Sequence, residues 1–246
     1  MTLSGVSQLC CRVLVALALA SSLSAGVIFE RALPTANLND AAGANRSNIS
    51  WGPGDSSYIL GDDFTLASDS VINSLSVWEV SNGDSPTTEF GSLSLYAGAD
   101  PDLAFISSSY LTSLVTGYQN QGSSGAFYDV YKITFSGLNL TVAGGVQYDF
   151  GIGATPGTES SLSLHASHAA LSGSTQDGAD GFFFGFSGPP YTLAYVIDPA
   201  AGEVPLWDKG SDINVEIDGS AVPEPATFGL LAMGAGALLF LRLGRA

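Results

Sequence analysis

Cysteine is nearly absent from this chain of 246 residues, which contains only Cys10 and Cys11. Both lie in an N-terminal segment that we expect to be removed, for reasons given below. The mature protein would then contain no thiol. This excludes structural disulfides, cysteine nucleophiles and cysteine metal ligands, so the fold must depend on its hydrophobic core.

Positive charge is also scarce. Between residues 27 and 222 four basic side chains (Arg31, Arg46, Lys132 and Lys209) stand against 22 carboxylates, which gives a formal net charge of −18. Such a surface repels phosphate backbones and anionic lipid headgroups, so nucleic-acid binding is not expected. It suits a soluble extracellular protein and would attract divalent cations or basic partners.

Helical periodicity is missing from the same stretch, which shows neither an amphipathic helix of ordinary length nor an internal repeat. Apolar and polar residues alternate instead, in runs around Leu75, Leu93, Ile133, Phe150 and Val215. Each run would bury one face and leave the other in water, which indicates antiparallel sheet.

Turn-forming residues separate these runs, at residues 82–86, 98–102, 144–145, 155–157, 188–190 and 198–199. Short strands punctuated in this way predict an all-β fold, an antiparallel β-sandwich of jelly-roll type. We expect one domain over residues 27–221, because all-β domains often reach this size.

The N-terminus has the pattern of a secretory signal peptide. Residues 1–12 form a basic region ending at Arg12, residues 13–20 are apolar, and residues 21–26 are small. The apolar run is too short to span about 30 Å of hydrocarbon comfortably. We therefore expect residues 1–26 to form a signal helix that is removed after Ser24, Ala25 or Gly26; the alternative is a retained membrane anchor.

The C-terminal residues 222–246 combine three features. Val222, Pro223, Glu224 and Pro225 open the segment, residues 226–241 carry no charge, and Arg242 and Arg245 follow. The uncharged run predicts a transmembrane helix of about 24 Å, somewhat short of a full span. The two arginines would lie on the cytoplasmic side of the inner membrane and leave the body outside.

These three features resemble the PEP-CTERM sorting signal of Gram-negative bacteria. The resemblance covers about a tenth of the chain and implies a partner, an exosortase-like membrane protease that cuts near the motif formed by Val222, Pro223, Glu224, Pro225, Arg242 and Arg245. It also implies an association with extracellular polysaccharide. An ordinary tail anchor is the alternative. The order of motifs between Tyr58 and Ile152 is weakly similar to β-sandwich surface domains found ahead of such anchors.

Catalytic and metal-binding patterns are weak. His165 and His168 are interpreted as surface histidines, and the chain contains no Gly-x-Ser-x-Gly elbow of a serine hydrolase. Asp177 and Asp180 lie among glycines in a loop that could bind calcium, although the remaining positions of an EF-hand loop are missing. A plain acidic turn is the alternative, and no other cofactor or metal is expected.

Aromatic residues offer a second kind of binding site. Trp51, Trp207 and Tyr191 could stack on sugar rings if they are exposed, whereas Trp78 and Phe183 lie in apolar runs and are expected to fill the core.

Together these patterns predict a non-enzymatic protein that is exported, held at the inner membrane as an intermediate, and delivered to the cell surface or extracellular matrix in a structural or adhesive role. A non-catalytic carbohydrate-binding module is the first alternative. A polysaccharide hydrolase is the second.

Overall fold

The alternating runs of the sequence form β-strands. The structure is a computed structural model that describes residues 26–33, 46–51, 58–81, 83–99, 103–121, 127–159, 162–168, 183–186, 193–196 and 211–222. In these ranges fourteen strands are present and every pairing between them is antiparallel. The prediction of an all-β, antiparallel fold is confirmed.

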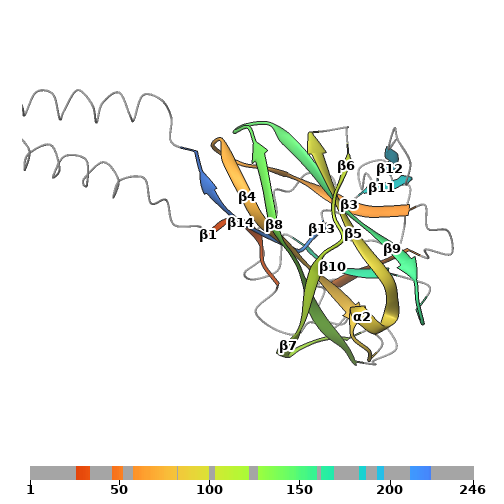
Figure 1. The fold of residues 1–246 in the computed structure, drawn as a ribbon. Coiled ribbons are helices and arrows are strands. Elements are labelled where there is room, and N and C mark those ends of the chain that lie inside the picture. Colours follow the sequence, from red (N-terminus) through yellow and green to blue (C-terminus); the bar gives the residue numbers. More distant parts are fainter. Residues whose placement is uncertain are drawn as a thin grey trace, which may run out of the picture.

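The larger sheet has eight strands and is organised around β4 (Figure 1). Strand β4 pairs with β14, β8 and β10; β1 pairs with β14, β7 with β8, and both β2 and β13 with β10. The bounds are β1 Gly26–Arg31, β2 Arg46–Trp51, β4 Ser70–Ser81, β7 Tyr110–Gln121, β8 Phe127–Val142, β10 Leu162–His168, β13 Ser211–Ile213 and β14 Val215–Ala221.

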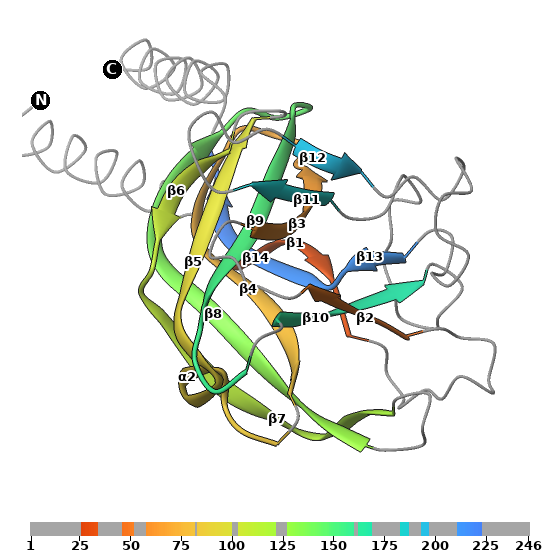
Figure 2. The same cartoon turned by 90° about the vertical axis from the view of Figure 1, so that its right-hand side faces the viewer.

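The smaller sheet has six strands in the order β12-β11-β3-β9-β5-β6. Figure 2 shows its long strands curving beside β4 and β8, so that one side of the body resembles half of a barrel. The bounds are β3 Tyr58–Thr65, β5 Phe90–Ala99, β6 Ala104–Ser107, β9 Gln147–Pro156, β11 Phe183–Phe186 and β12 Leu193–Val196.

The main hydrophobic core draws side chains from both sheets. Leu93 and Phe150 come from the smaller sheet, Ile133 and Val215 from the larger one, and all four are fully buried. Burial of this many aliphatic and aromatic side chains is the largest favourable contribution to folding, at about 1.5–3 kcal/mol for each.

A second, smaller cluster covers the opposite face of β4 and β8. It consists of Trp78, Val80, Tyr118 and Val130, and it confirms that Trp78 is a core residue. As a result β4 is buried on both faces from Leu75 to Ser81, so the expectation that each alternating run leaves one face in water is wrong for this strand. The same expectation fails for Asp149 on β9, which is 3% exposed.

The described turns follow the sequence signals with small shifts, and the predicted turns at 188–190 and 198–199 lie outside the described residues. Gly144 and Gly145 form the turn between β8 and β9, as predicted. Thr155 and Pro156 still belong to β9, so that turn begins at Gly157. After β4 the chain makes one helical turn, α2 (Pro86–Glu89), which Pro86 favours at its first position. Among the described residues no helix is long and apolar enough to span a membrane.

Candidate functional site

Most residues singled out in the sequence lie outside the described ranges, so their predictions are not tested here. These residues are Pro223, Glu224, Pro225, Arg242 and Arg245 of the sorting motif, Asp177 and Asp180 of the calcium loop, and Trp207 and Tyr191 of the glycan-stacking set. Trp51 is described only as a backbone position, opposite Leu162 at the end of β2. Val222 is described fully.

Val222 marks the point at which the folded body gives way to the sorting segment. It follows β14 directly, its backbone N–H donates to the carbonyl of Asp69 at 2.7 Å, and its side chain is 41% exposed. Strand β14 pairs with β1 so that Gly219 lies opposite Gly26. The first and last strands of the body are therefore neighbours, and their outer ends point the same way (Figure 1).

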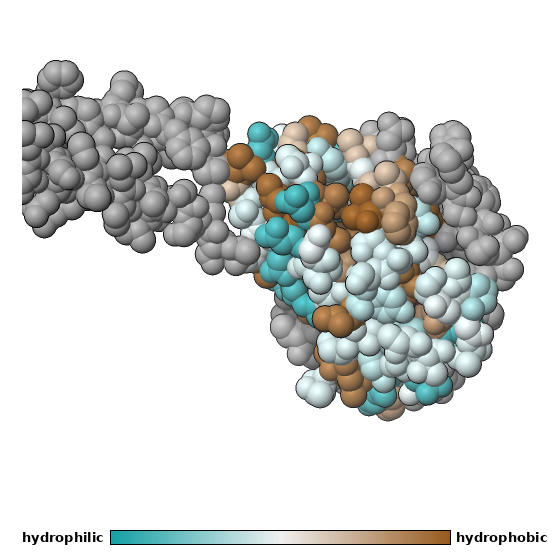
Figure 3. Space-filling view, in the orientation of Figure 1, coloured by the Kyte–Doolittle hydropathy of each residue, from teal (hydrophilic) through white to brown (hydrophobic). Residues whose placement is uncertain are grey.

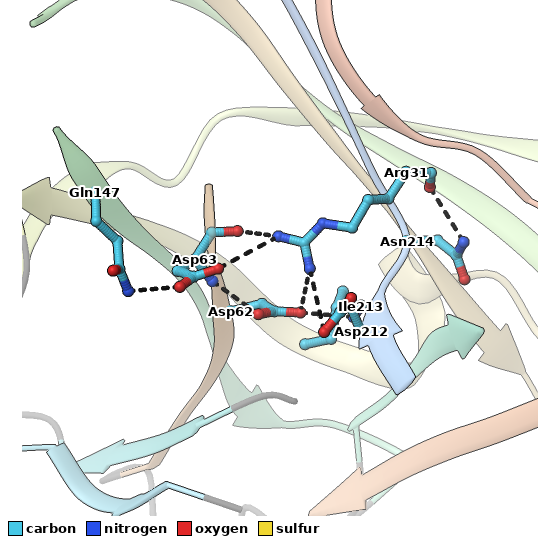
Figure 4. Close-up of polar contacts among 7 residues, drawn as sticks. All are labelled: Arg31, Asp62, Asp63, Gln147, Asp212, Ile213 and Asn214. Atoms are coloured by element: carbon cyan, nitrogen blue, oxygen red, sulfur yellow. Dashed lines mark hydrogen bonds and ion pairs between the residues drawn. The ribbon is translucent and has the colours of Figure 1, made fainter. Parts of the chain in front are cut away.

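The most elaborate polar cluster surrounds Arg31, at the end of β1 (Figure 4). Its guanidinium is 1% exposed and donates to Asp62 Oδ2 at 2.7 Å and to the backbone carbonyl of Asp63. Carboxylate oxygens of Asp63 and Asp212 lie 3.8 Å from its Nη atoms. Because Asp62 belongs to β3 and Asp212 to β13, the cluster ties the edge strand β1 to both sheets.

Asp62 is the centre of that cluster. Its two oxygens accept hydrogen bonds from the backbone N–H groups of Asp63 at 2.8 Å and Ile213 at 2.7 Å. Burial raises the pKa of Asp62 to about 8, against the lowering effect of Arg31 and with a further rise from Asp212. The Arg31 guanidinium and the two backbone N–H groups favour the ionised form and so offset part, but not all, of the desolvation.

A second polar chain leads from the end of β1 to the small cluster. The Asn214 side-chain amide donates to the carbonyls of Arg31 at 3.1 Å and Ala32 at 2.7 Å, so its oxygen is the acceptor for His165 Nδ1 at 2.7 Å. His165 Nδ1 therefore carries a proton, and Nε2 shares a hydrogen bond of 2.7 Å with the Tyr118 hydroxyl.

The interpretation of His165 as a surface histidine is wrong, because its side chain is completely buried. Its strand β10 lies between the main core and the second cluster, and Tyr118 of β7 covers it at a ring distance of 5.6 Å. The side chain of His168 lies outside the described residues. Since both ring nitrogens of His165 are engaged within the core, its role is to join strands.

A third cluster is acidic and lies at the α2 end of the body. Glu79 of β4 and Glu89 of α2 are 1% and 2% exposed, and Ser81 Oγ donates to Glu89 Oε1 at 2.6 Å. No described group lies within hydrogen-bond distance of Glu79 Oε2. Burial, and after it the hydrogen bond to Glu89 and the charges of Glu89 and Glu159, raise the pKa of Glu79 from 4.5 to about 10. Glu79 is therefore protonated and neutral at pH 7.

Sequence reasoning did not find these three clusters, although two signals were present. Arg31 is one of only four basic residues in an acidic body, and Asp62 interrupts a run of strand residues between Ile59 and Phe64. Both patterns indicate a buried ion pair. The acidic cluster has no comparable signal in the sequence, because Glu79 and Glu89 meet only through the packing of α2.

The chemistry that these clusters support is structural. Their side chains are buried, and they bind one another and the backbone. In the part of the chain that the structure describes, no group of three or more His, Cys, Asp or Glu side chains is arranged to hold a metal ion.

No protein-family model matches the chain, and a search of curated proteins finds no match. The functional conclusion therefore depends on the residues themselves and on the geometry that they form.

Proposed function

We propose that this protein is an exported, non-enzymatic component of the bacterial cell surface or extracellular matrix, sorted through residues 222–246. An exosortase-like protease is the processing partner, and extracellular polysaccharide is the medium in which the mature body acts. The body is held at the inner membrane until it is processed.

One observation carries this proposal. Strand β1, which begins at the last residue of the predicted signal peptide, pairs antiparallel with β14, the last strand before the sorting motif, with Gly26 opposite Gly219. Both predicted membrane segments thus leave the body at one end. This is the arrangement that a domain needs if its two apolar ends reach the same membrane while the whole body stays on one side.

The junction with the tail suits a protease substrate. Strand β14 ends at Ala221, and among the described residues the last backbone hydrogen bond of the body runs from Val222 to Asp69. The motif at Pro223, Glu224 and Pro225 begins one residue later, and two prolines prevent it from continuing the strand. A protease could therefore read the motif without unfolding the sheet.

The body itself supports a structural role. We propose that its two sheets face each other as a β-sandwich of jelly-roll type, since the main core takes side chains from both. Its described polar clusters hold strands together, as those around Arg31 and His165 do.

The test is the fate of the full chain in a Gram-negative host that expresses exosortase. We expect a product shortened at both ends in the extracellular or surface fraction, whereas a Glu224→Ala/Pro225→Ala variant stays in the inner membrane. Glu30→Ala, a change at an exposed glutamate of β1, is the matched control and should be sorted normally. Recovery of the intact, uncut wild type from the cytosol would refute the proposal.

A further inference from the structure

The end of the body from which both termini leave has an unusual surface. We call it the terminal face and define it by the start of β1 (Gly26 and Val27), the loop 66–69, the turn 143–146, and Ala221 with Val222. These segments are adjacent: Ala221 lies opposite Ser70, and Ser70 opposite Val142.

Backbone hydrogen bonds fix the terminal face as one surface. Asp69 accepts from the Val222 N–H through its carbonyl at 2.7 Å and from the Gly144 N–H through its carboxylate at 2.8 Å. The Gly145 N–H donates to Leu66 at 2.8 Å. The turn packs closely on the loop, since a Cβ on Gly144 would lie 2.6 Å from the Cα of Ser68. These contacts hold the segments of the terminal face in fixed positions relative to one another.

Charge is almost missing from this face. Of its twelve residues only Asp69 is charged, in a body whose formal charge is −18, and its carboxylate accepts the hydrogen bond from Gly144. The opposite end of β4 and β8, by contrast, carries Asp84, Glu89, Asp129 and Glu159. Among the described residues the terminal face therefore carries fewer carboxylates than the far end of β4 and β8, and Asp218, opposite Val27, lies at its border.

The terminal face carries exposed apolar side chains instead of charged ones. Val27, Val146 and Val222 are 52%, 40% and 41% exposed, and they are three of the seven exposed large hydrophobic side chains in the described ranges. Figure 3 shows hydrophobic surface at the left end of the body, over the β1–β14 end of Figure 1, followed by a band of hydrophilic surface.

We propose that the terminal face is a membrane-resting surface that contacts the headgroup layer of the bilayer holding the tail. The inference rests on the proposed function, because it requires residues 226–241 to insert. Only Pro223, Glu224 and Pro225 separate Val222 from that apolar run, a tether of at most about 14 Å.

The short tether keeps the body near the membrane. The interfacial layer on each side of the hydrocarbon is about 5–8 Å thick, so a tether of at most about 14 Å holds the body within about 9 Å of the headgroups. A carboxylate-rich end would be repelled there by anionic lipids, whereas an uncharged end with small and apolar side chains is accepted. Both the short tether and the charge distribution therefore favour a lipid surface as the partner that contacts the terminal face.

The test measures the depth of two ends of the body. The full chain, in a Cys10→Ser/Cys11→Ser background, receives a single fluorescent label at Val146→Cys or at Thr87→Cys and is reconstituted into phosphatidylcholine/phosphatidylglycerol vesicles. Thr87 is exposed on α2, at the far end of β4 from the terminal face, and is the matched control. We expect lipids with a headgroup-level quencher to reduce the Val146 label several-fold more than the Thr87 label. Val146→Asp should lower the quenching of a label at Val27→Cys, and Thr87→Asp should not.

The outcomes separate this inference from the proposed function. Equal quenching at both positions in chains whose tail has inserted would overturn the membrane-resting surface and leave the sorting proposal standing. Failure of the chain to insert would overturn both. A Val146 label that becomes protected without lipid, as protein concentration rises, would show that a second copy covers the face and would also overturn the inference.

Discussion

Replacing Glu79 by Gln should change how stability depends on pH. Glu79 is buried beside Glu89, and burial raises its pKa from 4.5 to about 10. In the unfolded chain the carboxyl is ionised above about pH 5, whereas in the folded protein it keeps its proton. The folded state therefore binds one more proton between these two values, and the free energy of unfolding must fall as pH rises.

The size of the change in stability follows from the single proton by which the folded and unfolded states differ. Each pH unit in this window costs about 1.4 kcal/mol, so between about pH 5 and pH 8 Glu79 alone removes about 4 kcal/mol of stability. Glutamine has nearly the shape of the protonated acid and does not titrate. The Glu79→Gln variant should therefore lose less stability than the wild type over this range, by about that amount.

The assay is urea unfolding of the full chain in detergent at several pH values, followed by tryptophan fluorescence. Glu30→Gln, the same change at an exposed glutamate of β1, is the control for the change of charge. The buried Asp62, whose pKa is raised to about 8, contributes a slope of the same sign but is present in every variant, so it cancels in the comparison. Parallel pH profiles for the wild type and Glu79→Gln would refute the assignment of a proton to Glu79.

Two further predictions concern stability alone. Arg31→Met should lower the free energy of unfolding by about 3 kcal/mol, because it leaves the buried Asp62 and Asp212 without their guanidinium. Lys132→Met, which removes a partly exposed pair with Glu216, should cost less. Urea midpoints decide, and equal losses would contradict the argument. Gly157→Ala should lower the melting temperature, because the new Cβ would lie 2.3 Å from the Glu89 carbonyl oxygen and must displace α2. Gly26→Ala is the control and should not lower it, because a Cβ there meets nothing within 4 Å. An unchanged melting temperature for Gly157→Ala would show that α2 moves freely.

Much of the fold could be predicted because apolar and polar residues alternate with a period of two along a strand. The runs around Leu75, Leu93, Ile133, Phe150 and Val215 all lie in strands. Period two identifies a strand, but it does not show what covers its second face. Trp78 and Val80 alternate with Val77 and are buried as well, since Tyr118 and Val130 pack against them.

The polar clusters could not be predicted because their members meet only in the folded chain. Arg31 contacts Asp62 and Asp212, which lie far from it in sequence, and its environment depends on the order of strands in two sheets. His165 was misinterpreted for the same reason. Its burial comes from Tyr118 and Asn214, neither of which is near it along the chain. The sorting motif, by contrast, is local, which is why it could be proposed from sequence; it stays a prediction.

The pairing of β1 with β14 also sets the order of events during synthesis. Gly26 emerges from the ribosome about 190 residues before its partner Gly219, and at 5–20 residues per second this takes about 10–40 s. Throughout that interval the edge of β14 does not exist, and Arg31 lacks Asp212. The larger sheet therefore cannot be completed until β14 has been synthesised, because β14 is the strand that joins β1 to β4.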